Sequence, residues 1–384
     1  MSRDISPPPL KRQRLVQKPT GPEREQSVSS LRLFSWNING ISPFIQKPIT
    51  SFFTSDKGIQ PPPQASLRDF LQRHDFPDIL FLQEVKINPS DTTSLNAVSR
   101  AIKRGASEPE ANPDYVAHFC LPSDKFNATG FGRKVYGVCS IIRQDFADKY
   151  VGRMRTVDWD AEGRFSVIET KAINDLPKLA IFNVYMVNGT ENAYKDSTTG
   201  VVTGTRHTRK LAVHRLLQAE VRKLESDGYH VIIAGDVNIA VARIDGHPNL
   251  RVTPQQHVLN RQDFTDRFLG NADTSELGTS DDTATEDVPS TGLNMADTFR
   301  SLHSDKKGYS YYPRGRPFGE SCDRVDMILC SRSLEARCTE AGMLATSADR
   351  GTSDHVPIYA TFHLPNNLGM DGLDVLDHKS SDLQ

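Results

Sequence analysis

The chain has 384 residues, of which 37% are apolar and 24% are charged, a composition typical of folded globular proteins. It has neither an apolar run long enough to cross a membrane nor the apolar segment of a secretory signal, so we expect no membrane association. The five cysteines form no Cys-x-x-Cys pair, which argues against a disulfide scaffold and a thiolate zinc site and favours an intracellular protein.

The net charge of −2 is an average over segments of unlike charge. Residues 1–30 carry a net charge of +3, residues 272–292 carry −6 and residues 366–384 carry −3, which leaves +4 for the rest. These segments contain few apolar residues, so we expect a disordered basic tail, a disordered acidic loop and a disordered C-terminal tail. The basic tail contains Lys11-Arg12-Gln13-Arg14, a weak nuclear-localisation pattern that is more often a solvated charge cluster.

Residues 31–365 are expected to form one α/β domain. Its strand-length apolar runs are, in chain order, Leu31–Trp36, Asp78–Gln83, Gly137–Ile142, Phe165–Thr170, Leu179–Tyr185, His230–Ala234, Asp326–Ser331 and Val356–Phe362. Two helices are expected, over residues 66–74 and 208–225. The apolar face of the second consists of Val213, Leu217, Val221 and Leu224. Many strands with few helices between them favour two packed sheets flanked by helices over a doubly wound parallel sheet.

Polar side chains capable of catalysis stand at the ends of these runs. They occur in Asn37-Ile38-Asn39-Gly40, Gln83-Glu84, Tyr185 with Asn188, Gly235-Asp236-Val237-Asn238, Arg324-Val325-Asp326 and Ser353-Asp354-His355. Each motif alone is more often a turn or a solvated strand end. If the sheets align, however, all of them open into one polar cleft on rigid supports.

Three of these residues suit a hard metal ion. Asn39, Glu84 and Asp354 offer the amide and carboxylate oxygens that Mg²⁺ prefers, whereas Zn²⁺ favours His or Cys. A Mg²⁺ ion can neutralise a phosphodiester oxygen and the leaving alkoxide. Beside them, Asp236 can orient or deprotonate the attacking water, with Asn238 on the same short turn.

The remaining residues suit proton transfer and charge stabilisation. A protonated His355 can hold a non-bridging phosphate oxygen, and Asp326 can fix the histidine tautomer and raise its pKa. Tyr185 can donate a hydrogen bond to the developing oxyanion or the leaving oxygen. Together these roles describe in-line hydrolysis of a phosphodiester.

The ordered set of motifs resembles the endonuclease/exonuclease/phosphatase superfamily and, more narrowly, the exonuclease III-type apurinic/apyrimidinic (AP) endonucleases. The resemblance spans roughly residues 31–363. It rests on Ser35–Gly40, Leu82–Lys86, Glu162-Gly163-Arg164, Asn183-Val184-Tyr185 with Asn188, Gly235–Ala240, Asp297–Arg300, Arg324–Asp326 and Ser353-Asp354-His355.

The resemblance implies a four-layer α/β sandwich in which two packed, mostly antiparallel β-sheets are flanked by helices. It implies a Mg²⁺-dependent enzyme of base-excision repair, with Mn²⁺ as a substitute, that cleaves double-stranded DNA 5′ to an abasic site. Activity as a 3′-phosphodiesterase, 3′-phosphatase or 3′–5′ exonuclease is also implied.

The resemblance also assigns roles to residues. It places Asn39, Glu84 and Asp354 at metal positions, and Asp236, Asn238 and His355 at water and phosphate positions that we count as further candidate ligands. Tyr185 matches the catalytic tyrosine and Asp326 the partner of the histidine. The candidate substrate-binding residues are Asn37, Asn188, Arg164, Tyr311 and Arg314.

Three departures from the family pattern concern the substrate. Val187 replaces a proline in Tyr-x-Pro-Asn, and Cys322-Asp323 stands where many relatives carry a bulky apolar residue, often tryptophan. The aromatic and basic segment 309–316 contains Tyr311, which can stack on a base, and Arg314, which can hold a phosphate. The alternative is that the segment is an ordinary turn whose aromatic rings pack on the sheet.

Two rival hypotheses stay open at this point. The first keeps the catalytic chemistry but assigns it to RNA, inositol phosphate or a lipid. The second is a nucleic-acid-binding scaffold without activity, which is disfavoured because every metal and water position is filled. We expect a monomer that acts on DNA in the nucleus.

Overall fold

The computed structural model describes residues 30–45, 66–128, 136–173, 176–270, 292–346 and 349–364. The segments expected to be disordered lie outside the described residues, apart from their end residues Ser30 and Gly292. Among the described helices, none is long and apolar enough to span a membrane.

The strands are β1 (Ser30–Asn37), β2 (Ile79–Gln83), β3 (Tyr115–Cys120), β4 (Val138–Arg143), β5 (Val151–Thr156), β6 (Phe165–Thr170), β7 (Leu179–Tyr185), β8 (Ala193–Lys195), β9 (Val202–Thr205), β10 (His230–Asp236), β11 (Gly246–His247), β12 (Ala296–Asp297), β13 (Cys322–Asp323), β14 (Asp326–Cys330), β15 (Cys338–Met343) and β16 (Ile358–His363). The helices are α1 (Ser42–Ile45), α2 (Leu67–Arg73), α3 (Thr92–Ala101), α4 (Gln144–Tyr150), α5 (Arg206–Ser226), α6 (Gln255–Phe264), α7 (Thr298–Leu302) and α8 (Arg332–Glu335).

Most strands belong to two six-stranded sheets. The first has the order β15-β16-β1-β2-β4-β3 and the second β12-β14-β10-β7-β6-β5. Each sheet contains one parallel pair, β1 with β2 and β7 with β10, and all its other neighbours are antiparallel. The expected mostly antiparallel sheets are confirmed.

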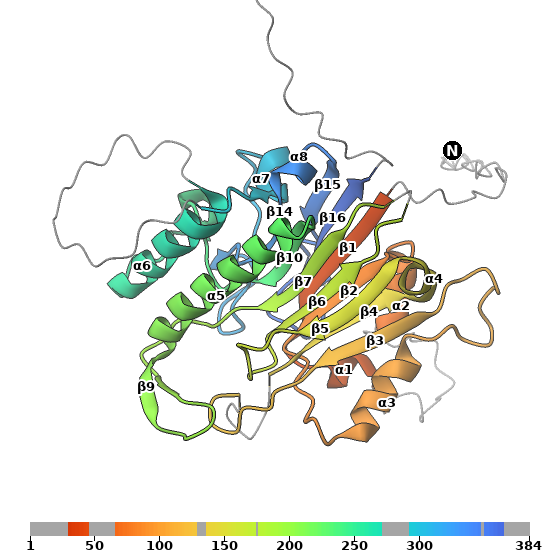
Figure 1. Cartoon of the computed structure of the whole chain (residues 1–384), viewed down its shortest axis with the longest axis horizontal. Helices are drawn as coiled ribbons and strands as arrows, with labels where there is room; N and C mark the ends of the chain where they lie inside the picture. The colour runs from red at the N-terminus through yellow and green to blue at the C-terminus, as the bar shows by residue number, and fades with distance from the viewer. Residues whose placement is uncertain are drawn as a thin grey trace, which may run out of the picture.

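The two sheets pack face to face between two layers of helices (Figure 1). The central core joins side chains of both sheets, such as Leu33 and Ile232. A second apolar cluster packs α5, through Leu217, on the outer face of β6, β7 and β10. A third packs α2, through Phe70, on the outer face of β1, β2 and β4. The expected four-layer sandwich is therefore confirmed.

All eight expected strands and both expected helices are present, with bounds within two residues of those expected. The expected helix 208–225 begins two residues earlier because Thr205 caps it: the Thr205 hydroxyl accepts from Thr208 N and the Thr208 hydroxyl accepts from Thr205 N. The substantial strands that the sequence did not indicate are β3, β5 and β15, and each lies at the edge of a sheet.

A buried polar contact links the sheets just below the ends of their central strands. Gln83 Nε2 donates to Ser35 Oγ (3.0 Å) and to Asn183 Oδ1 (2.8 Å), and so connects β2 with β7 across the core. Asn183 Nδ2 in turn donates to the Cys139 carbonyl (3.0 Å). Since buried polar groups are costly unless they are paired, these bonds favour one alignment of the two sheets. That alignment places the strand ends with the predicted catalytic residues side by side.

Candidate active site

Four central strands deliver polar side chains to one end of the sandwich. The parallel pairs align Asn37 with Gln83 and Tyr185 with Asp236, so each sheet contributes two strand ends at the same edge. Asn37 joins the two contributions, since its Nδ2 donates to Glu84 Oε1 (3.2 Å) and to Asp236 Oδ2 (3.0 Å). The structure thus brings the predicted residues of both sheets into one site.

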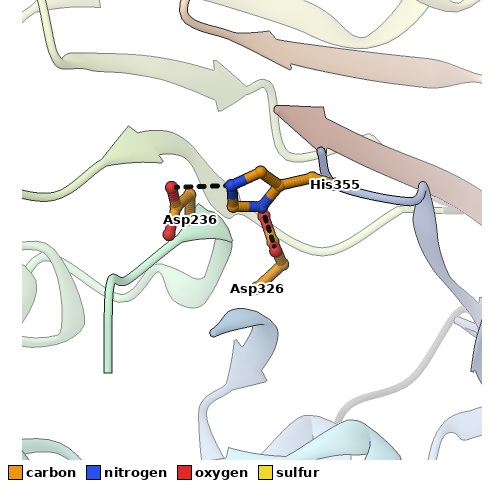
Figure 2. Close-up of side chains that lie close together, drawn as sticks. All are labelled: Asp236, Asp326 and His355. Carbon is orange, nitrogen blue, oxygen red and sulfur yellow. Dashed lines mark hydrogen bonds and ion pairs between the residues drawn. The ribbon is translucent and has the colours of Figure 1, made fainter. Parts of the chain in front are cut away.

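His355 lies between two aspartates, as Figure 2 shows. Its Nδ1 is 2.7 Å from Asp326 Oδ2 and its Nε2 is 3.9 Å from Asp236 Oδ2. The two aspartates are cross-strand neighbours of β10 and β14. Trp36 Nε1 donates to the His355 carbonyl (3.0 Å), and Ser353 Oγ accepts from His355 N (3.0 Å). The imidazole is therefore fixed with Nε2 toward Asp236.

The surroundings of His355 favour its charged form. Burial acts to lower the pKa of His355, but the carboxylates of Asp326 and then Asp236 outweigh it, so the pKa is raised. The pKa of Asp236 is also raised, by burial and then by the negative charge of Asp326. The site therefore holds an imidazolium beside a carboxylate that readily accepts a proton.

A second group of contacts surrounds Glu84. Its Oε1 accepts from the Tyr185 hydroxyl (2.6 Å), and its Oε2 lies 2.9 Å from Lys86 Nζ. Burial acts to raise the pKa of Glu84, but Lys86 and then Tyr185 outweigh it and the pKa is lowered. Burial and the charge of Glu84 raise the pKa of Tyr185, so the phenol keeps its proton.

The Lys86 ammonium marks a position suited to a cation. It contacts Glu84 Oε2 and also donates to Asn39 Oδ1, so two oxygens from the ends of neighbouring strands converge on one positive charge. Asn39 Nδ2 donates to Asp354 Oδ1 (2.8 Å), which brings a second carboxylate to the same place. These hard oxygen donors fit a divalent ion such as Mg²⁺ or Mn²⁺.

Ligand atoms of three acidic and imidazole side chains also lie within 4.8 Å of one another, in Asp236, Asp326 and His355. His355 Nδ1 and Asp326 are already paired with each other, which suits the proton-carrying role predicted for them. Asp236 Oδ1 accepts from Asn238 N (2.9 Å), and Asn238 Nδ2 donates to the Met186 carbonyl (2.9 Å). The Asn238 side chain thereby helps to hold the turn that follows Tyr185, although Val187 replaces the family's proline there.

These groups open into a cavity of about 270 Å³. The predicted residues that line it are Glu84, Tyr185, Asn188, Asp236, Asn238, Tyr311, Asp354 and His355. Asn37 and Asp326 stand behind them as buried partners. Most of the predicted site therefore faces one hollow, while Asn37 and Asp326 act through the residues they hold.

Two predicted substrate-binding residues lie away from the cavity. The Arg164 side chain is 2% exposed, and its guanidinium stands 4.6 Å from the ring centres of both Tyr136 and Tyr185. That position supports Tyr185 from behind and gives no support to the predicted contact with DNA. Arg314 is exposed and donates to the Thr352 carbonyl.

The sequence analysis missed Lys210, a buried cation that lines the cavity. Its Nζ donates to the Asn238 carbonyl (2.8 Å), and burial lowers its pKa to about 7. The signal was present: Lys210 precedes Val213 by three residues and so continues the apolar face of α5, where a charged side chain is unexpected.

Two known proteins are similar in sequence to most of this chain. The chain is 26% identical over 347 residues to the mouse protein named DNA-(apurinic or apyrimidinic site) endonuclease 2, a match covering 87% of this chain and 60% of that protein. A relative of the same name from Xenopus laevis is 25% identical, with 86% of this chain and 59% of that protein covered. The chain thus spans about three-fifths of the length of these relatives.

Solved structures share the fold. The Xenopus laevis APE2 catalytic domain has a TM-score of 0.57 at 19% identity, with 87% of this chain and 92% of that one covered. A Neisseria 3′ phosphatase bound to a product DNA hairpin has a TM-score of 0.52 at 17% identity, with 86% and 99% covered. The model of the Endonuclease/Exonuclease/phosphatase family matches residues 34–355. The chain therefore belongs to the Endonuclease/Exonuclease/phosphatase family, which confirms, at the level of the family, the expected metal-dependent phosphodiesterase.

Proposed function

We propose that the protein is a Mg²⁺-dependent DNA-(apurinic or apyrimidinic site) endonuclease of base-excision repair, which hydrolyses the phosphodiester 5′ to an abasic site. The observation that carries this proposal is that His355, paired with Asp326 behind it, lines the same cavity as the carboxylates of Glu84 and Asp354. One set handles protons and the other suits a cation, which is the combination that phosphodiester hydrolysis needs. The names of the relatives support DNA with abasic sites as the substrate.

Glu84, Asn39 and Asp354 would hold the metal, through the oxygens that converge near Lys86. When bound, Mg²⁺, or Mn²⁺ in its place, supplies positive charge that stabilises the phosphorane-like transition state and the leaving oxygen. The Lys86 ammonium already balances Glu84 at this position.

The proton-carrying residues have separate tasks. Asp236 accepts the proton of the attacking water, because its raised pKa makes its carboxylate a better base. His355 donates from Nε2 to a non-bridging phosphate oxygen, while Asp326 on Nδ1 keeps the ring oriented and charged. The protonated Tyr185 hydroxyl donates to the leaving oxygen.

The same site can serve 3′ ends of DNA, so we include 3′-phosphodiesterase and 3′–5′ exonuclease activity in the proposal. Outside the three acidic or basic segments the chain carries a net charge of +4, which favours a nucleic-acid partner. We further propose that the protein acts as a monomer, and that it acts in the nucleus on the basis of the segment Lys11–Arg14, which lies outside the described residues.

The decisive experiment offers the protein a duplex with one tetrahydrofuran abasic analogue, in parallel with single-stranded RNA and inositol phosphates. We expect incision 5′ to the analogue with Mg²⁺ and none with EDTA. Equal or faster turnover of RNA or inositol phosphate would show that DNA with an abasic site is not the preferred substrate. Incision that persists in EDTA would show that the reaction does not depend on a divalent metal ion.

A further inference from the structure

Lys210 is a buried cation of the cavity that the proposed mechanism does not use. It lies near the start of α5 and is 2% exposed. Its Nζ donates to the Asn238 carbonyl (2.8 Å) and to the Val237 carbonyl (3.4 Å). An ammonium taken out of water is costly unless hydrogen bonds and nearby charges compensate it. A lysine at this place on the apolar face of α5 therefore points to a task that an apolar side chain could not perform.

The two carbonyls belong to the turn that carries Asp236. Among the described residues, Lys210 is the one donor to either of them. Asn238 has a φ of 54°, a left-handed conformation that is costly for a residue other than glycine and persists where surrounding contacts hold it. Asn238 N donates to Asp236 Oδ1 (2.9 Å), which links the turn to the carboxylate. A turn that relaxes without Lys210 therefore shifts the Asp236 carboxylate.

Both ends of the Lys210 contact rest on rigid parts of the fold. On α5, Val213 and Leu217 are buried against the outer face of the second sheet, so the helix is fixed independently of Lys210. On the turn, Val237 N donates to the Val325 carbonyl (2.9 Å), next to the start of β14. A backbone carbonyl thus binds an N–H of the turn while α5 binds its carbonyls. Supporting contacts of this kind keep a catalytic group in its productive geometry.

We propose that Lys210 is a positioning residue for phosphodiester hydrolysis. By donating to the Val237 and Asn238 carbonyls, it holds the Asp236 carboxylate where it accepts the proton of the attacking water. The inference rests on the proposed function, because it acts through the role given there to Asp236. It assigns the effect to the N–H groups of Lys210, which bind the turn, and not to a contact between Lys210 and the substrate.

The first test removes the N–H groups and keeps the bulk of the side chain. Lys210→Met should lower kcat on the abasic duplex by about 10–100-fold, because a small displacement of the base slows proton transfer. KM should stay close to the wild-type value, and raising Mg²⁺ should not restore the rate. Lys223→Met removes an exposed lysine of the same helix and should keep the wild-type kcat.

The second test returns the missing donor. Lys210→Ala leaves a space beside the cavity that matches propylammonium, which has the three carbons and the nitrogen that the substitution removes. Propylammonium should raise the kcat of this variant severalfold, whereas tetramethylammonium, which carries the same charge but no N–H, should not. Leu217→Ala loosens α5 without touching the turn, so propylammonium should leave its kcat unchanged.

A third measurement follows the turn itself in metal-free protein. The ¹³C resonance of the Asn238 carbonyl reports its hydrogen bond with Lys210. It should shift in both Lys210 variants, and propylammonium should return it toward the wild-type position in Lys210→Ala. The methionine variant fills the space of the lysine stem, so it keeps the test decisive if the alanine variant does not fold.

The outcomes separate this inference from the proposed function. A wild-type kcat in Lys210→Met, or an alanine variant that responds to both ammonium ions or to neither, overturns the positioning role and leaves the nuclease assignment intact. Wild-type protein that cleaves no abasic duplex overturns the proposed function. An Asn238 resonance that does not move in the Lys210 variants shows, with or without activity, that Lys210 does not hold the turn.

Discussion

The two halves of the site achieve charge balance in different ways. Around His355, the three side chains are between 1% and 7% exposed and balance one another within the protein. Around Glu84, the side chains of Glu84 and Lys86 are 18% and 20% exposed, and a lysine supplies the compensating charge. The first half is ready for proton transfer as folded, whereas the second holds oxygens that a stronger cation can share. If the proposed function is right, the comparison teaches that proton handling around His355 and metal binding around Glu84 are separable, and we expect that each can be perturbed without the other.

The largest effect is expected at Asp236. Asp236→Asn removes the base but keeps the shape, so we expect kcat on the abasic duplex to fall on the order of 10³-fold. Because the loss is one of proton transfer, raising Mg²⁺ should not restore it. Steady-state kinetics over a metal titration measures both points, and recovery at high metal would contradict the division between the two halves.

A smaller and metal-dependent effect is expected at Glu84. Glu84→Gln removes a ligand charge, so activity at low Mg²⁺ should fall roughly 10–100-fold and return substantially as Mg²⁺ or Mn²⁺ is raised. The apparent metal affinity from the same titration is the readout. A loss of equal size at every metal concentration would place Glu84 with the proton-carrying residues instead.

The smallest effect is on stability, where the two halves should respond at opposite ends of the pH range. The folded pKa of His355 is raised to about 10, so its stabilising contribution is complete below pH 6.5 and disappears as the pH rises toward 10. The pKa of Glu84 is lowered, so its contribution is complete above pH 4.5 and is lost as the pH falls through its folded value.

Denaturant unfolding in EDTA across this pH range measures the difference. His355→Gln should flatten the alkaline side of the stability curve by about 1–3 kcal/mol, and Glu84→Gln should flatten the acidic side. If both variants flatten the same side of the stability curve, the residues around His355 and those around Glu84 do not balance charge in different ways.

The sequence predicted the interior of the fold better than its edges. Strands such as β2 and β7 are buried along their whole length, so they appear as continuous apolar runs. The missed strand β5 is partly exposed throughout and carries Arg153 and Arg155. Edge strands owe their conformation to one neighbour, and their side chains carry a weaker apolar signal.

Within the site, the motifs at strand ends predicted which residues meet, because parallel strands end at a common edge. They did not predict contacts that depend on side-chain direction. Arg164 turns under Tyr185, and Lys86 turns toward Asn39, although both belong to motifs recognised in the sequence. The sequence showed Asp323 only as a departure from the family pattern. Its pairing with Arg251 could not be predicted, because the two residues lie far apart in the chain.

The amide of Asn37 has a consequence for how this enzyme loses activity. One side-chain nitrogen touches a carboxylate from each sheet, so a small slip between the sheets breaks both contacts together. Under the proposed function, we therefore expect heat or core substitutions that loosen the contact between the sheets to disable proton transfer and cation binding together.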